Sequence, residues 1–149
     1  EIDDNLYYQW HTITNTAGNG ICPEGWHVPS DEEWKELEMY LGICPGYYGD
    51  NETYYEYDTN GGCLDDRGWR GTNEGEILAN LDMLDILQIG YIHDETVEHI
   101  TDNTYFWTTD EDINYSFAAL HRGFSNQTSK IYRHDWNKYY GFSIRCIQD

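Results

Sequence analysis

Hydrophobic and polar residues alternate with a helical spacing in one early part of the chain. Trp34, Leu37 and Leu41 recur every three or four residues, so we expect them to share the buried face of a helix. Ser30, followed three residues later by Glu33, matches the capping box that begins many helices. The glycine directly after Leu41 is typical of a helix end. The pattern predicts a helix that starts after Ser30 and ends at Leu41.

The rest of the chain is expected to hold a second helix and several strands. Residues 71–81, GTNEGEILANL, resemble a short helix, and residues 5–14 have a strand pattern. Residues 43–66 are rich in turn-forming residues and are expected to form an irregular loop. Strand-like segments follow Gly90, over residues 91–100, 104–109, 115–122, 130–136 and 141–148. Early helices before a late antiparallel sheet predict the α+β class.

The length and composition suit one domain over residues 1–149. Aromatic residues reach 16%, with 6 Trp and 14 Tyr, and aromatic side chains serve binding faces as well as cores. No apolar run approaches the roughly 18 residues of a membrane-spanning helix, so we expect no membrane insertion.

The net charge of −20 is unevenly spread. Residues 1–112 hold 26 acidic residues against three basic ones, whereas residues 113–149 hold five basic residues against two acidic ones. The C-terminal quarter is therefore either a distinct electrostatic surface or a segment that packs against the acidic part. The overall charge argues against a nucleic-acid partner, because phosphates would be repelled.

The four cysteines, Cys22, Cys44, Cys63 and Cys146, allow three pairings. They form no zinc-binding pattern, so disulfides are the favoured interpretation and free buried thiols the alternative. We favour the pairs Cys22–Cys146 and Cys44–Cys63. Disulfides imply an oxidising environment, so we expect an extracellular or cell-surface location.

Several stretches, in order, resemble the Fibrobacter succinogenes major paralogous domain, a family of secreted bacterial modules. They are LYYQW at residues 6–10, ICPEGWHVPSDEEWKELE at 21–38, WRGTNEG at 69–75, YFWTTDE at 105–111 and YYGFSIRCIQD at 139–149. The resemblance implies a C-type-lectin-like fold with two helices, a small twisted sheet and a disulfide from before the first helix to the last strand. Cys22 and Cys146 match that bridge, whereas the Cys44–Cys63 pair rests on spacing alone.

Metal and catalytic sites find little support in the motifs. The chain lacks the proline tripeptide of the C-type-lectin calcium site, and WNK at residues 136–138 lacks the acid of the matching strand. No cofactor is expected, although acidic clusters such as Asp110 to Asp112 could supply oxygen ligands to a structural calcium ion. No catalytic arrangement is identifiable from spacing, so we expect a protein that is not an enzyme.

Residues 121–140, HRGFSNQTSKIYRHDWNKYY, interleave aromatic rings with hydrogen-bonding side chains. Rings stack on sugars or peptide side chains, and Arg and Asn donate hydrogen bonds. The alternative is a sheet with ordinary aromatic core residues, in which alternate side chains point inward. We expect the ligand contacts among Arg122, Phe124, Arg133, Asp135, Trp136 and Tyr139.

These features predict a secreted or cell-surface module that binds a glycan or a protein surface through its C-terminal strands and loops. Two other hypotheses are a hypervariable display domain diversified by a retroelement and a structural accessory module of a surface assembly. The sequence names neither the ligand nor the oligomeric state.

Overall fold

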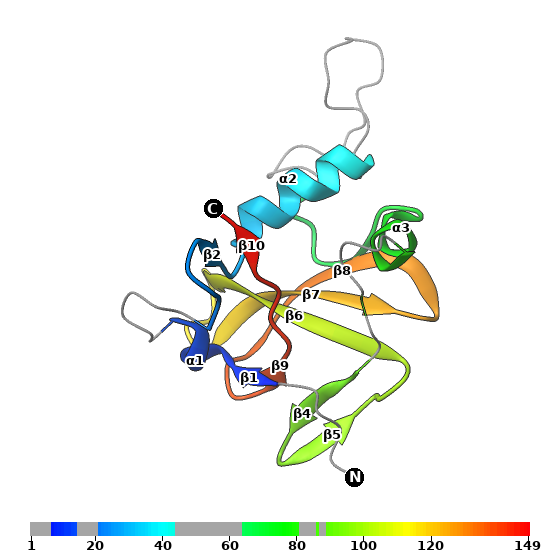
Figure 1. The fold of residues 1–149 in the computed structure, drawn as a ribbon. Helices are drawn as coiled ribbons and strands as arrows, with labels where there is room; N and C mark the ends of the chain where they lie inside the picture. Colours follow the sequence, from blue (N-terminus) through cyan, green and yellow to red (C-terminus); the bar gives the residue numbers. More distant parts are fainter. Residues whose placement is uncertain (1–6, 15–20, 44–63, 81–85, 87–88) are drawn as a thin grey trace.

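The computed structural model describes residues 7–14, 21–43, 64–80, 86 and 89–149 (Figure 1). Within these residues, the helices are α1 (Trp10–Thr14), α2 (Asp31–Leu41) and α3 (Glu74–Asn80). The strands are β1 (Tyr8–Gln9), β2 (Trp26–His27), β3 (Gly68–Arg70), β4 (Tyr91–His93), β5 (Thr96–Glu98), β6 (Asn103–Glu111), β7 (Ala118–Ser125), β8 (Thr128–Asn137), β9 (Gly141–Phe142) and β10 (Ile147–Gln148).

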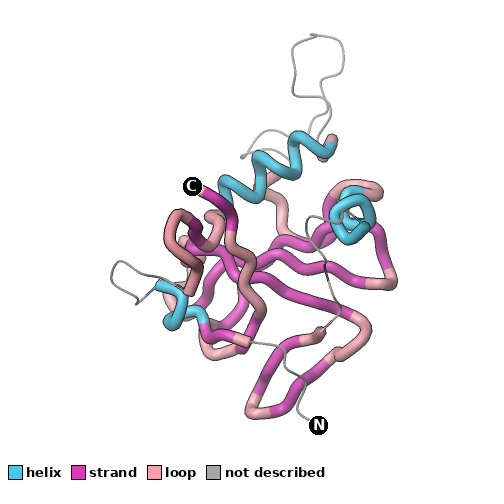
Figure 2. Tube along the Cα trace, in the orientation of Figure 1, coloured by secondary structure: helices cyan, strands magenta, loops and turns pink. Residues whose placement is uncertain are grey.

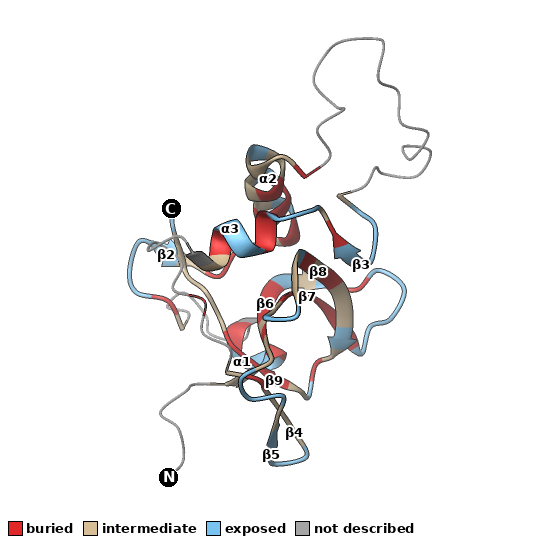
Figure 3. Cartoon of the chain, turned by 90° about the vertical axis from the view of Figure 1, so that its right-hand side faces the viewer, coloured by how far each residue is buried: buried red, intermediate tan, exposed pale blue. Residues whose placement is uncertain are grey.

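The described strands form three sheets, and every pairing between named strands is antiparallel. The central sheet has the order β3-β8-β7-β6 and contains the three longest strands. A second sheet has the order β1-β9-β4-β5, and β10 pairs with β2. Helix α2 lies on one side of the central sheet, and the β4–β5 hairpin lies on the other (Figures 1 and 3).

The predicted α+β class with two helices and a small lectin-like sheet is wrong. The structure is mostly β: among the described residues, ten strands form three sheets and there are three helices (Figure 2). The physical reason is that early segments also pair with the late strands: β1 joins β9, β2 joins β10 and β3 joins β8. These pairings join residues far apart in the chain, which local patterns do not encode.

The prediction for α2 is confirmed from Asp31 to Leu41. The Ser30 hydroxyl accepts from the Glu33 backbone N–H, and the Glu33 carboxylate accepts from the Ser30 N–H, which completes the capping box. Gly42 ends the helix in the left-handed region at φ 103°. Trp34 is buried, whereas the two leucines of the same face are half-buried against the core.

Other local predictions have mixed outcomes. The helix near residues 71–81 is confirmed as α3. The strand expected over residues 5–14 is wrong beyond Gln9, because α1 begins at Trp10 and buries Trp10 and Ile13 on one side. The strand expected over residues 141–148 is broken, with β9 and β10 belonging to different sheets.

No helix in the described ranges is long and apolar enough to cross a membrane.

Each face of the central sheet carries one hydrophobic cluster, and buried residues concentrate there (Figure 3). The cluster beneath α2 and α3 includes Trp34, Leu78 and Phe124. The cluster on the opposite face includes Trp107 and Phe142. The central sheet is therefore covered on both sides, and side chains of β7 and β8 divide between two environments.

One disulfide lies within the described residues. Cys22 and Cys146 are bonded with their Cα atoms 5.7 Å apart, as the resemblance implies. It joins the approach to α2 to the C-terminal segment. The predicted Cys44–Cys63 pair lies outside the described residues.

Candidate functional site

The alternation of β8 decides which C-terminal side chains can reach a ligand. Successive strand residues point to opposite faces of a sheet, and directly opposed residues on paired strands share a face. Tyr132 and Trp136 lie opposite Gly123 and Ala119 of β7, and between them His134 lies opposite His121. These residues therefore share the face that looks away from α2.

That face holds an aromatic pocket of about 220 Å³. Its walls come from four elements distant in the sequence, β3, β4, β6 and β8, and its floor from β7 and β9. We call it the aromatic pocket, and its lining residues are Trp69, Tyr91, Tyr105, His121, Tyr132, Trp136 and Phe142.

The rim of the aromatic pocket is open and its floor is closed. Trp69 is 41% exposed and Trp136 is 39% exposed, whereas His121 and Phe142 are buried. Trp69 packs against Tyr132 with ring centroids 5.0 Å apart, so the two rings form a continuous aromatic surface. A ligand can therefore pack against the exposed rings of the rim.

His121 is the unusual group of this floor. Its ring centroid lies 5.4 Å from that of Tyr105, 5.8 Å from Tyr132, 6.3 Å from Trp136 and 5.0 Å from Phe142. Neither ring nitrogen has a hydrogen-bond partner among the residues that the structure describes. Buried polar groups are nearly always paired, so two unpartnered nitrogens beside a pocket indicate an unmet hydrogen-bonding capacity.

The same surroundings keep His121 neutral. Burial lowers its pKa well below 6.5, and the nearby charges of His134, Arg122 and Arg67 lower it further. The neutral ring offers one N–H donor and one acceptor nitrogen.

Gly123 keeps the pocket open between two walls. A Cβ atom at this position would lie 2.9 Å from Tyr105 Cε1 and 3.1 Å from Tyr132 Cβ, so one of the two side chains would have to move. The glycine therefore lets both tyrosines cover β7.

Three of the predicted contact residues lie on the other face. Arg122, Phe124 and Arg133 are buried beneath α2, so the sequence-based prediction placed them wrongly on an exposed binding surface. The reason is the alternation of the strands, which turns these side chains toward the helix. Arg122 Nη1 donates to Asp31 Oδ1 at 2.7 Å, and Arg133 Nη2 donates to Asp31 Oδ2 at 2.6 Å.

The buried charges form a compact cluster between α2 and the sheet. Arg122 Nε donates to Glu38 Oε1 at 2.6 Å, and Arg70 Nη2 donates to the same oxygen at 2.9 Å. Burial opposes ionisation of Asp31, but hydrogen bonds from Arg133 and the charge of Arg122 outweigh it and hold the pKa of Asp31 well below 3.8. The C-terminal cations thus pack against the acidic part of the chain, which was one of the two alternatives for the charge asymmetry.

The other predicted contact residues differ in position. Trp136 lies on the rim of the aromatic pocket, and Tyr139 is 70% exposed in the turn before β9. Asp135 is half-buried and forms an ion pair with Arg67, which also pairs with Asp112. Of the predicted residues, Trp136 alone lines the aromatic pocket.

One acidic group among the described residues has the spacing of a metal site, and a lysine occupies it. Carboxylate oxygens of Asp31, Glu32 and Asp65 lie within 4.8 Å of one another. The Lys35 ammonium lies 3.2 Å from Asp31 Oδ2 and 2.7 Å from Glu32 Oε1, and it also pairs with Asp65. The lysine therefore supplies the positive charge that these acids require.

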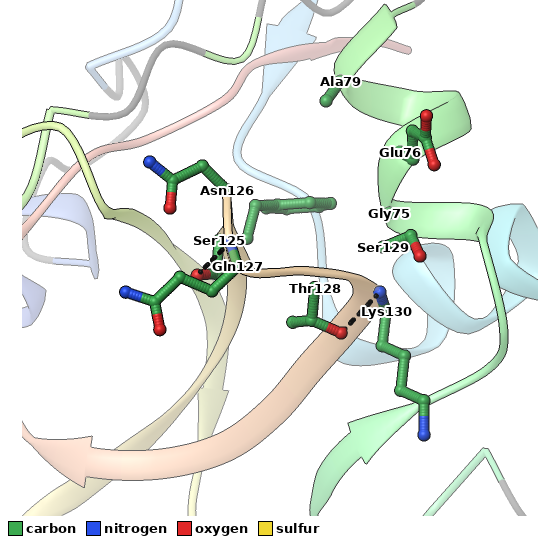
Figure 4. Close-up of a pocket in the computed structure, with 10 residues that line it drawn as sticks. Gly75, Glu76, Ala79, Ser125, Asn126, Gln127, Thr128, Ser129 and Lys130 are labelled. Carbon is green, nitrogen blue, oxygen red and sulfur yellow. Dashed lines mark hydrogen bonds between the residues drawn. The ribbon is translucent and has the colours of Figure 1, made fainter.

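A second, larger hollow of about 530 Å³ lies between α3 and the β7–β8 hairpin (Figure 4). Asn126 and Gln127 line its hairpin side, and Glu76 and Ala79 line its α3 side. Phe124 contributes to its wall. None of its lining side chains carries a buried polar atom without a partner in the described part of the chain. The aromatic pocket is therefore the better candidate site.

Sequence reasoning missed most of the aromatic pocket. Trp69, Tyr91 and Tyr105 come from β3, β4 and β6, far from the C-terminal stretch that the composition singled out. Trp69 lies in the motif WRGTNEG and Tyr105 lies in the motif YFWTTDE, both of which carry the family resemblance. These motifs were the one signal in the sequence that the two residues could share a role.

The comparison with protein families identifies the chain. The model of the Fibrobacter succinogenes major domain matches residues 3–148. The chain belongs to this family. Neither the curated proteins nor the solved structures contain a significant match to it. The comparisons therefore assign no ligand to the aromatic pocket of this Fibrobacter succinogenes major domain, and its function is inferred from its geometry.

Proposed function

We propose that this Fibrobacter succinogenes major domain is a non-enzymatic, secreted or cell-surface binding module that recognises a glycan or a protein surface through the aromatic pocket. The observation that carries the proposal is the combination of half-exposed Trp69 and Trp136 with a buried floor at His121. Such a concave site with exposed rings offers apolar contact area and a few polar groups that fix orientation.

The disulfide supports the proposed location. Disulfides such as Cys22–Cys146 are common where thiols are kept oxidised, as in secreted and surface-attached proteins.

The experiment is a binding screen of the whole chain on glycan and protein arrays, followed by two matched variants. Trp136→Ala removes a ring from the rim, and Trp26→Ala removes a ring that is similarly exposed, at 45%, and does not line the pocket. We expect Trp136→Ala to weaken binding by about 2 kcal/mol, roughly 30-fold, as truncation of an aromatic hot spot does. Trp26→Ala should bind as the wild type does.

Thermal unfolding of both variants is the folding control. Because both rings are more than one third exposed, the unfolding midpoints should stay close to that of the wild type. Equal affinities of wild type, Trp136→Ala and Trp26→Ala for the array ligand would refute the aromatic pocket as the binding site.

A further inference from the structure

We propose that the aromatic pocket receives the guanidinium group of an arginine side chain from a basic protein partner. The inference rests on the proposed function: of its two ligand classes it selects the protein surface, and it names the side chain that enters the pocket.

The lining of the pocket is entirely aromatic. Each of its seven residues carries a ring, and none carries an aliphatic chain or a formal charge at neutral pH. The faces of aromatic rings attract cations, and arginine makes this contact more often than lysine does. Tryptophan attracts cations most strongly, and Trp69 and Trp136 are the most exposed rings of the pocket. The rim therefore offers the ring type that a cation prefers.

The size of the pocket suits the end of one side chain. Its volume of about 220 Å³ lies below the roughly 300–1,000 Å³ of sites that hold drug-sized molecules. A guanidinium is planar, is more weakly hydrated than an ammonium and stacks on aromatic faces. It therefore suits a small pocket lined by rings better than a lysine ammonium does.

The basic groups nearest the floor do not present a free positive charge to the pocket. The charges of His134, Arg122 and Arg67 are close enough to influence His121. Burial lowers the pKa of His134, so its ring is uncharged at neutral pH. Each of the two arginines is paired with two carboxylates, and Arg122 lies on the opposite face of the sheet. A cation at the rim therefore meets little opposing charge.

Acidic groups attract a cation at short and long range. The Tyr91 hydroxyl donates to Glu98 Oε2 at 2.8 Å, which places a half-exposed carboxylate beside one wall of the pocket. Over the whole chain, 28 acidic residues against 8 basic ones give the net charge of −20. Such a field speeds the approach of a basic partner and repels an acidic one.

The surface next to Trp136 suits a protein partner rather than a free small cation. The Phe117 carbonyl accepts from the Lys138 backbone N–H at 3.1 Å, which joins the β6–β7 loop to the turn after β8. These two segments lie at the end of β8 that holds Trp136, and they carry the exposed rings of Tyr115, Phe117 and Tyr139. Exposed rings gathered in this way are typical of protein interfaces.

The test uses the side-chain indole N–H resonances of the 6 tryptophans in ¹H–¹⁵N spectra of the intact chain. The probes are N-acetylargininamide and N-acetylcitrullinamide, which has nearly the same shape and no charge, each at about 10 mM to detect a Kd near 1 mM. We expect the arginine probe to shift the Trp69 and Trp136 resonances and to leave Trp26 in place. The citrulline probe should bind at least about fivefold more weakly, because it cannot form the cation–π contact.

Trp136→Leu separates the aromatic ring from its apolar area. It keeps a large apolar side chain and removes the ring face, so the affinity for the arginine probe should fall about fivefold. Trp26→Leu is the matched control, because Trp26 is similarly exposed and does not line the pocket. If Trp136→Leu does not fold, Trp69→Leu on the same rim provides the affinity test.

The contrary outcomes are distinct. The inference would be overturned by the absence of a shift at Trp69 and Trp136 with the arginine probe, by equal affinity for the citrulline probe, or by unchanged affinity in Trp136→Leu. Array binding to uncharged glycans that Trp136→Ala weakens would also overturn it and would leave the proposed function intact. Array binding that Trp136→Ala leaves unchanged would instead refute the proposed function.

Discussion

At the scale of single residues, Asp31 joins α2 to the central sheet. It is the first residue of the helix, and its two carboxylate oxygens accept hydrogen bonds from Arg122 and Arg133 on neighbouring strands. A buried carboxylate needs such partners, because an unpaired buried charge is costly. Removal of one partner from a cluster of this kind is therefore expected to be more damaging than removal of a surface charge.

We predict that Asp31→Asn lowers the free energy of unfolding by about 3–5 kcal/mol, because it removes the carboxylate that two buried guanidinium groups share and leaves Arg122 with Glu38 alone and Arg133 with the more distant Asp65. Guanidinium chloride unfolding of the intact chain measures this loss. Glu32→Gln is the matched control, since the Glu32 side chain is 77% exposed and pairs with Lys35 alone among the described residues. A loss no larger than that of the control would show that the buried cluster contributes little.

His27 gives the chain a dependence on pH at the residue scale. Its Nε2 lies 2.7 Å from Glu33 Oε1 and its Nδ1 lies 2.6 Å from Asp149 Oδ1. The hydrogen bond with Glu33, then that with Asp149, raises the pKa of His27 above 6.5. The protonated ring therefore links the start of α2 to the segment after β10.

We predict that the stabilisation from His27 is present below about pH 6.5 and is lost as the pH rises through the raised pKa. The unfolding midpoint of His27→Gln should therefore fall below that of the wild type at about pH 6 and approach it at about pH 9. Thermal unfolding over this range measures the difference. A difference that grows with pH would contradict the sign.

At the scale of elements, α2 was predictable because its determinants are local. The capping box, the spacing of Trp34 from the leucines and the terminal glycine all act within one or two helical turns. By contrast, the strand expected at residues 5–14 failed because α1 is fixed by distant contacts. The Trp10 indole N–H donates to the carbonyl of Thr108 at 2.9 Å, and the Lys138 ammonium lies 4.4 Å from the Trp10 ring centroid.

We predict that Trp34→Ala costs about 3–5 kcal/mol of stability, because it leaves a cavity beneath α2 where Trp34 packs on Phe106 and Phe124. Urea unfolding provides the measurement. Trp26→Ala is the control, since Trp26 is exposed and should change stability by about 0.5 kcal/mol or less. Equal effects of the two substitutions would mean that α2 is not anchored by its tryptophan.

At the scale of the whole molecule, the disulfide and the long-range pairings hold segments that the chain order separates. Cys22 and Cys146 are 124 residues apart in the sequence. The β10–β2 pairing lies beside this bridge, with Ile147 opposite His27. The C-terminal segment is therefore tied to the approach of α2 by a covalent bond as well as by hydrogen bonds.

We predict that replacement of both cysteines of the Cys22–Cys146 bridge by alanine lowers the free energy of unfolding by about 4–5 kcal/mol in the chain-entropy model, because the bridge closes a long loop. Denaturant unfolding of the double variant in the absence of reductant isolates this bond. A loss near zero would show that non-covalent contacts alone fix the C-terminal segment.

The candidate site shows why sequence patterns reach only part of a binding surface. The C-terminal composition indicated aromatic contacts, and Trp136 does line the aromatic pocket. Alternate residues of β8 point to opposite faces of the central sheet, and both faces receive large side chains from this strand. Hydrophobicity alone therefore could not decide that Arg133 faces α2 while Trp136 faces the pocket.

The sequence by itself determined the local features and the family: the helix α2 with its caps, the short helix α3, the strand-rich C-terminal part and the motifs of the Fibrobacter succinogenes major domain. The tertiary structure alone decided that the fold is mostly β, that Arg122 is buried on Asp31, and that His121 lies beneath rings from four other strands. The physical reason is range. Caps and periodicity act between neighbouring residues, whereas strand register and the choice of sheet face depend on contacts between segments that meet only in the folded chain.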